Sequence, residues 1–145
     1  ILIAQKNYAE LDRFFFRNSG ISMGVISLGA VLLWLLVYGL NYFEHPLAQR
    51  MLFPLPFGLF IAGTVLGQIT QCQAAYLRAH KKEPFLVYGL VHGFSNGIVV
   101  WFLGSRYGAI GASAGYLLVK SLVAVPLCSY IWIKCRKKWH ADEVY

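Results

Sequence analysis

The chain has 145 residues, of which 58% are hydrophobic and only 13% are charged, and its net charge is +7. Together with a mean hydropathy of +0.56, this composition argues against an ordinary soluble domain and indicates a membrane protein. We attribute the positive charge to membrane topology and to anionic lipid headgroups, which argues against nucleic acid as a partner.

Residues 1–18 have the pattern of a cytoplasmic amphipathic helix at the membrane interface. Their apolar residues recur at helical spacing, as in Tyr8, Leu11 and Phe15, while the charged residues fall mostly elsewhere. The segment is not a signal peptide, because its charged part lies between a short apolar stub and the first long apolar run. We expect residues 1–4 to end an earlier helix, and the chain to be the C-terminal piece of something longer.

Four apolar runs predict an all-α membrane protein with four transmembrane helices. Each run is close to the ~20 residues that a helix needs to cross the hydrocarbon, and none contains Asp or Glu. The predicted spans are 19–43, 52–76, 85–103 and 109–133. They form a transmembrane domain over 19–133, which a basic cytoplasmic tail follows at 134–145.

The second predicted span is unusually polar. Thr64, Gln68 and Gln71 share one helical face, and Gln73 lies nearby. These side chains either form hydrogen bonds between helices, which are worth only ~0.6 kcal/mol per pair, or line a polar cavity.

The third predicted span carries two adjacent stripes with a repeat of four residues. The first stripe consists of Gly89, Gly93 and Gly97. The second stripe consists of Tyr88, His92 and Asn96. We expect the glycines to pack closely against a neighbouring helix, and the polar stripe to face polar surroundings.

The fourth predicted span contains a lysine near its middle. Lys120 lies about 16 to 20 Å along the helix from either interface, which is too deep for its ammonium group to reach water by snorkelling. Ser113 and Tyr116 share its face. The lysine either donates to a buried carbonyl or glutamine, is neutral, or faces a wet cavity that attracts anions. Pro126 leaves the carbonyl of Leu122 without a donor, so we expect a bend nearby.

Basic residues predict the topology. Three precede the first span, three lie between the second and third, and four follow the last, whereas the opposite loops carry only Arg50 and Arg106. The positive-inside rule therefore predicts a multi-pass protein with both termini in the cytoplasm.

No enzyme, metal site or cofactor is expected. The three cysteines lack C-x-x-C spacing, and the four histidines never occur four residues apart. Neither a nucleophile motif nor a pair of carboxylates is present.

Several stretches of the chain match a known pattern. They are NYAELDRFFFR (7–17), QCQAAYLRAHKKEPF (71–85), the glycine-rich third span, SRYGAIGASAG (105–115) and WIKCRKKWH (132–140). Together they resemble the C-terminal part of bacterial polysaccharide or O-antigen flippases, which belong to the multidrug/oligosaccharidyl-lipid/polysaccharide exporter superfamily. The resemblance implies 12 to 14 helices in two lobes in the bacterial cytoplasmic (inner) membrane. This chain would supply the last four helices, and a missing N-terminal lobe or partner chains would complete the fold.

The resemblance also implies a substrate, an oligosaccharide linked through an anionic pyrophosphate to a polyprenyl lipid and used in polysaccharide or lipopolysaccharide biosynthesis. The groups expected to bind the phosphates are Lys120, Arg78 and Arg106, and those expected to line the sugar path are Gln68, Gln71, His92 and Asn96. The alternatives are a multidrug exporter of the same superfamily, a stand-alone four-helix transporter, or a membrane anchor or assembly module of a glycan-synthesis complex. The lack of an acid in the spans counts against the multidrug exporter.

Overall fold

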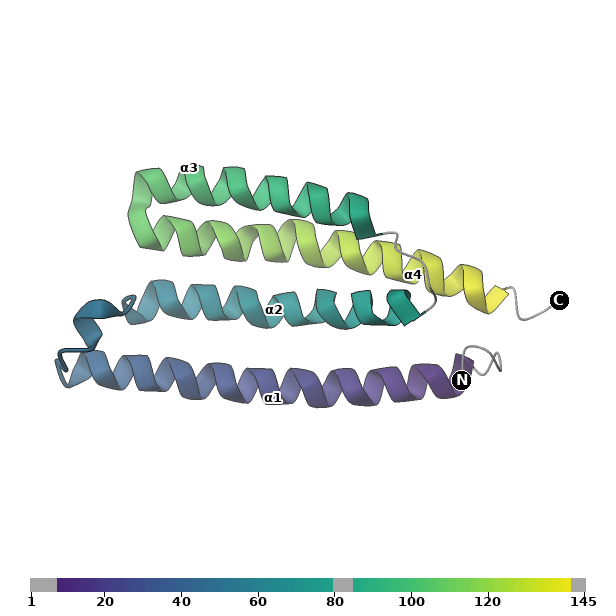
Figure 1. The fold of residues 1–145 in the computed structure, drawn as a ribbon, viewed down its shortest axis with the longest axis horizontal. Coiled ribbons are helices and arrows are strands. Elements are labelled where there is room, and N and C mark those ends of the chain that lie inside the picture. The colour runs from purple at the N-terminus through teal and green to yellow at the C-terminus, as the bar shows by residue number, and fades with distance from the viewer. Residues whose placement is uncertain (1–7, 80–84, 142–145) are drawn as a thin grey trace.

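The computed structural model describes residues 8–79 and 85–141, and every regular element within them is helical. The elements are α1 (Tyr8–Tyr42), the short 3-10 helix η1 (Ala48–Arg50), α2 (Pro54–Ala79), α3 (Phe85–Val119), the π-helical turn η2 (Lys120–Ala124) and α4 (Val125–Ala141) (Figure 1). The predicted end of an earlier helix at 1–4 lies outside the described residues, as do Lys81 and Lys82.

Helix α1 joins the predicted interfacial segment and the predicted first span into one continuous helix of 35 residues. It ends in a Schellman motif, in which the His45 N–H donates to the Leu40 carbonyl and the Glu44 N–H donates to the Asn41 carbonyl. Glu44 adopts the left-handed conformation, with φ of 49°, that this motif requires.

Helix α2 starts at Pro54, which suits the first position of a helix because its missing N–H would have no partner there. The Trp34 Nε1–H of α1 donates to the Pro54 carbonyl over 3.0 Å. A Cβ on Gly58 would lie 2.8 Å from the same Trp34 Nε1, so the indole packs directly on the glycine backbone. These contacts fix the connection between α1 and α2.

Helix α3 reverses direction at Gly108, where φ is 62° and ψ is −142° (Figure 1). Only glycine adopts such a backbone conformation without strain. The two limbs pack closely beside the turn, because a Cβ on Gly111 would overlap the Leu103 carbonyl oxygen and one on Gly115 would lie 3.2 Å from Leu103 Cδ1.

This turn corrects the predicted number of spans. Three helices, rather than four, are long and apolar enough to cross a membrane: Glu10–Tyr42, Pro54–Arg78 and Tyr88–Lys137. The third is a single run of 50 residues that contains the fourth predicted span and the third one from Tyr88 onward. The predicted loop at 104–108 is helical apart from the break at Gly108, because glycine allows a reversal without a long connection.

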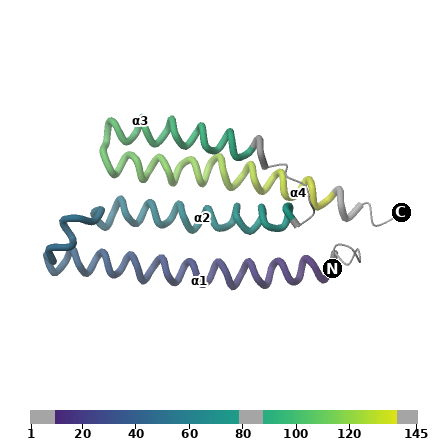
Figure 2. Tube along the Cα trace, in the orientation of Figure 1, coloured from purple at the N-terminus to yellow at the C-terminus, as the bar shows by residue number. Residues whose placement is uncertain are grey.

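The long helices lie side by side along one axis, and the start of α1 and the end of α4 are at the same end of the bundle (Figures 1 and 2). The buried core gathers at that end around Tyr76, Leu77 and Trp132, with Leu11 and Phe15 packed against it. Elsewhere large apolar side chains are exposed along the helices, as a lipid environment allows. Three candidate spanning helices with this surface suggest a multi-pass membrane protein.

Candidate functional site

Lys120 points from the start of η2 toward α2, between helices. A Cβ on Gly67 would lie 3.5 Å from Lys120 Nζ, so the glycine leaves room for the ammonium group. Lys120 Nζ also lies 5.5 Å from the centre of the Tyr116 ring, within the range of a cation–π contact. The residue is half-buried. Its charge therefore lies against polarisable and small groups inside the bundle.

The π-helical turn that begins at Lys120 follows from Pro126. Proline has no N–H to donate to the Leu122 carbonyl, and its ring would crowd that carbonyl in an α-helix. The backbone instead widens, and the Val125 N–H donates to the Lys120 carbonyl five residues earlier. The structure thus has a π turn at the place where a bend was predicted, and π turns often mark functional positions in helices.

The polar stripe of α3 faces the same region as Lys120. The Tyr88 and His92 rings stack with their centres 5.7 Å apart. His92 lies close enough to Lys120 for the two to interact electrostatically, and Tyr88 interacts with Thr70 of α2. Three of the predicted site residues, Lys120, His92 and Asn96, therefore belong to the face where α2, α3 and η2 meet.

Two atoms of this face are buried without a hydrogen-bond partner among the described residues, namely His92 Nε2 and Asn96 Oδ1. A buried polar atom without a partner costs about 1 to 3 kcal/mol. The face therefore retains hydrogen-bonding capacity that the present packing does not use. It combines a cation, an imidazole and an amide oxygen, which suits a ligand that carries both negative charge and hydroxyl groups.

Gln68 and Gln71 do not join Lys120. Gln68 Nε2 donates to Ser22 Oγ of α1 over 2.6 Å, and both glutamines line a groove of about 430 Å³ between α1 and α2. Gly67 of the same helix faces Lys120, so Gln68, which bonds to α1, points to a different side of α2 from the lysine. Arg78 is exposed at the end of α2, and Arg106 lies beside the Gly108 turn with its guanidinium 4.7 Å from the Phe102 ring.

The glycine stripe of α3 does not pack as expected. A Cβ on Gly89, Gly93 or Gly97 would meet nothing within 4 Å, and all three residues are exposed. The prediction of close helix packing at this stripe is therefore wrong within the described chain, since the polar stripe faces inward instead.

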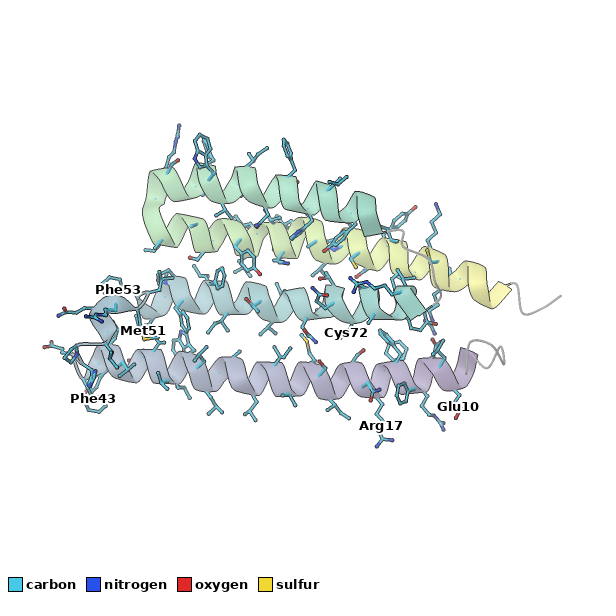
Figure 3. All side chains as sticks on the ribbon, in the orientation of Figure 1. Glu10, Arg17, Phe43, Met51, Phe53 and Cys72 are labelled. Carbon is cyan, nitrogen blue, oxygen red and sulfur yellow. The ribbon has the colours of Figure 1, made fainter. Side chains whose placement is uncertain are left out.

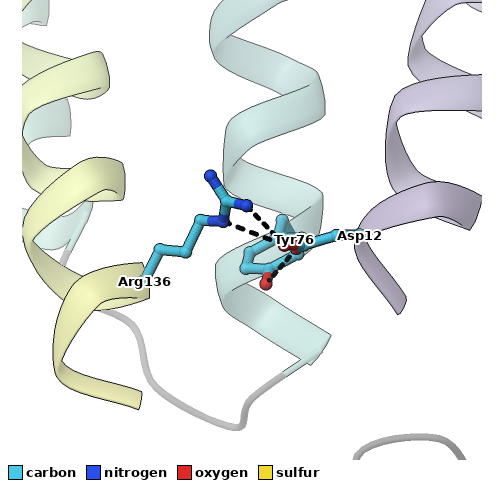
Figure 4. A network of polar contacts seen from close by, with 3 residues as sticks. All are labelled: Asp12, Tyr76 and Arg136. Atoms are coloured by element: carbon cyan, nitrogen blue, oxygen red, sulfur yellow. Dashed lines mark hydrogen bonds and ion pairs between the residues drawn. The ribbon is translucent and has the colours of Figure 1, made fainter. Parts of the chain in front are cut away.

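Sequence reasoning missed a polar network at the end of the bundle where α1 begins and α4 ends (Figure 4). Tyr76 Oη of α2 donates to Asp12 Oδ1 of α1 over 2.8 Å, and Arg136 Nε of α4 donates to Asp12 Oδ2 over 3.1 Å. Asp12 is only 9% exposed. The sequence did contain a signal for this network. Asp12 lies three residues before Phe15 and four before Phe16, so it falls at the edge of an apolar helix face.

Comparisons of this chain with protein-family models, with curated proteins and with solved structures gave no match.

Proposed function

We propose that this protein is part of a membrane transporter that moves a polyprenyl-pyrophosphate-linked oligosaccharide across the bacterial cytoplasmic membrane. The observation that supports the proposal is the direction of Lys120, which points between helices rather than away from them. An ammonium group at mid-membrane depth is expensive unless it has a polar or anionic partner. A pyrophosphate that crosses the membrane would supply that partner.

The neighbouring groups support the same class of substrate. Lys120 acts as a point charge that follows a moving phosphate, while Asn96 Oδ1 accepts a hydrogen bond from a sugar hydroxyl and His92 either donates or accepts. Both of these atoms are buried in the present packing. Substrate therefore reaches them when α3 moves away from α2, as in alternating access by rocking of helices.

In this proposal both limbs of the Tyr88–Lys137 run cross the membrane, which gives four crossings with both ends of the chain in the cytoplasm. Additional helices, from a longer chain or from partner chains, cover the exposed side of α3 and complete the path. Lys120 is half-buried within this chain alone, which leaves part of its side chain for such neighbours or for substrate.

Proteoliposomes that contain the complete transporter test the proposal. The measured quantity is the translocation of a fluorescent oligosaccharide linked through pyrophosphate to a short polyprenol. We expect Lys120→Ala to abolish translocation, Lys120→Arg to retain part of it, and Lys134→Gln, at an exposed lysine of α4, to leave it unchanged. Normal translocation by a correctly inserted Lys120→Ala protein would refute the transport role of this residue.

A second candidate function is that of a membrane anchor or assembly module. The exposed glycine stripe of α3 favours it, because small residues four apart let another helix approach closely in a membrane. If this function is correct, Gly93→Leu prevents association with the partner complex, and Lys120→Ala is tolerated. Chemical cross-linking in membranes measures the association. In the transporter, both substitutions impair translocation.

A further inference from the structure

One line of residues on α2 connects the end of this helix with Lys120. Gly67, Gln71, Ala75 and Arg78 follow one another at intervals of four, four and three residues, so they share one side of the helix. Gln71, Ala75 and Arg78 are exposed, and Gly67 faces the Lys120 ammonium group. The line covers about 16 Å from Arg78 to Gly67. A cation therefore lies at each end of it.

The groove of about 430 Å³ between α1 and α2 runs beside this line. Gln71 and Ala75 belong to both the line and the wall of the groove, and Gln68 is also in the wall. Another residue of the wall, Cys72, points from α2 toward α1 (Figure 3). The α1 side of the wall contributes a further amide, that of the exposed Asn18. Because several of its wall residues are exposed, the groove is open to whatever surrounds the bundle.

The amides of this groove lie at an unusual depth for exposed side chains. Gln71 lies about 10 Å along the helix from Arg78, and Gln68 about 15 Å, within the candidate span Pro54–Arg78. Gln68 bonds to α1, whereas the Gln71 and Asn18 side chains are exposed. Lipid tails offer no hydrogen bond, so an exposed amide at this depth is costly unless a polar group covers it. A ligand with hydroxyl groups would satisfy these amides, which both donate and accept.

The charges indicate which polar ligand fits this side of α2. Arg78 and Lys120 are positive, the amides between them are neutral, and the described wall of the groove contains no acidic residue. A headgroup that carries a phosphate and hydroxyl groups matches this order, since a guanidinium binds phosphate and amides bind hydroxyls. The open side of the groove leaves room for the chain of the same lipid to stay in the membrane. An apolar helix in this place would leave both the cations and the amides without partners.

We propose that this side of α2, with the groove beside it, is the entry site for the phosphate-and-sugar headgroup of a lipid from the leaflet on the side of the chain ends. Arg78 binds the phosphate first. As the headgroup moves into the membrane, the amides of Gln71 and Asn18 bind its hydroxyls, and the phosphate passes to Lys120. That this lipid is the transported substrate rests on the proposed function, whereas binding of the headgroup at this site does not.

Photo-cross-linking from Ala75 tests what occupies the entry site. The complete transporter in nanodiscs carries p-benzoyl-phenylalanine in place of Ala75, and the probe is a polyprenyl-pyrophosphate-linked oligosaccharide with a radioactive label in its sugar. We expect the label to become attached to the protein, and excess unlabelled probe to prevent this, whereas the free oligosaccharide and phosphatidylglycerol do not. The control position is Leu90, which is exposed on α3 at about one turn from the same end of the bundle and should give only background. A cross-link from Ala75 to protein alone would show that another helix covers this side, and would overturn the proposal.

Translocation kinetics separate entry from the later step at Lys120. Arg78→Gln should raise KM about tenfold and Gln71→Leu about threefold, with kcat within about twofold of the parent, because each removes a contact that forms at entry. Arg78→Lys keeps the charge and should restore most of the parent KM. Gln73→Leu is the matched control and should leave KM unchanged, because Gln73 lies on the opposite side of α2 and donates to Ser129 of α4.

The entry site is refuted if Arg78→Gln and Gln71→Leu both leave KM unchanged, or if Gln73→Leu raises KM as much as Gln71→Leu. Cross-linking does not require translocation, so the two proposals can fail separately. A headgroup cross-link at Ala75 in a protein that does not translocate the probe supports the entry site and contradicts the transport function. Translocation that depends on Lys120, without any headgroup cross-link at Ala75, contradicts the entry site and leaves the proposed function standing.

Discussion

The close packing of the two limbs of α3 predicts a large effect of one methyl group. In Gly111→Ala the new Cβ would overlap the Leu103 carbonyl oxygen and would lie 2.7 Å from the Tyr107 Cβ. A side chain can rotate away from such an overlap, but a backbone carbonyl cannot. The two limbs of α3 must therefore separate. Such overpacking costs about 1 to 3 kcal/mol, and we place this variant at the upper end, at ~3 kcal/mol. The better helix propensity of alanine offsets ~1 kcal/mol, which leaves ~2 kcal/mol of destabilisation.

Gly93→Ala is the matched control, because a Cβ there meets nothing within 4 Å on the same helix. Because no clash opposes the better helix propensity of alanine there, we expect Gly93→Ala to be as stable as the parent protein or more stable by up to ~1 kcal/mol. Equilibrium unfolding by SDS in mixed micelles, followed by far-ultraviolet circular dichroism, measures both variants. If Gly111→Ala unfolds within ~0.5 kcal/mol of Gly93→Ala, the two limbs do not pack as closely as described, and the turn at Gly108 needs another explanation.

Three further substitutions test individual contacts with the same unfolding assay or with amide hydrogen exchange. Trp34→Phe removes the hydrogen bond to the Pro54 carbonyl and should destabilise the protein by ~1 kcal/mol, whereas the exposed Trp101 changed to Phe should have little effect. Gln68→Leu removes the hydrogen bond to Ser22 and should cost no more than ~1 kcal/mol; a loss of several kcal/mol would contradict its role as a simple interhelical contact. Pro126→Ala restores an N–H, so its amide should become protected from exchange as the π turn narrows to an α-helix, and rapid exchange of that amide would show that proline is not the cause of the wide turn.

The sequence predicts which segments are helical better than it predicts how many helices they make. Helix α2 (Pro54–Ala79) overlaps the predicted span 52–76 closely, since Pro54 marks its start and a continuous apolar run follows. The predicted break at 104–108 contains Gly108, where the chain reverses, but the expected loop is absent, because the helix continues up to Gly108 and again after it, so the third and fourth predicted spans form one helical run. The sequence therefore located the reversal, but it did not show that a single glycine would suffice for it.

The orientation of the helix faces is harder to predict in a membrane protein than in a soluble one. Water drives apolar faces inward in a soluble bundle, but lipid tails are as apolar as a helix interior and set no such direction. The two stripes of α3 were therefore visible in the sequence, but the glycines, which were expected to pack against a neighbouring helix, are exposed, whereas His92 and Asn96 are partly buried. The same difficulty affects the predicted site. Its residues were chosen as polar positions in apolar helices, but the sequence did not show which of them face one another. In the structure Gln68 bonds to α1, whereas Lys120 lies against Gly67 on another side of α2.

Lys120 and Arg136 belong to the same continuous helical segment, residues 109–141, which contains the π turn. Arg136 follows Lys120 by 16 residues, which is roughly 24 Å along a helix. Before η2, the close contacts of Gly111 and Gly115 fix this segment to residues 99–107 of α3. After η2, Cys128 holds the segment to α2 through its contact with the Thr70 carbonyl, and Arg136 holds it to α1 through Asp12. In the π turn the backbone hydrogen bond spans five residues instead of four, and Pro126 beside it has no N–H to donate. This turn is therefore the part of the segment that bends most readily. A bend of this segment therefore falls at Lys120, and it moves the charge of this residue relative to His92 without disturbing the packing beside Gly108.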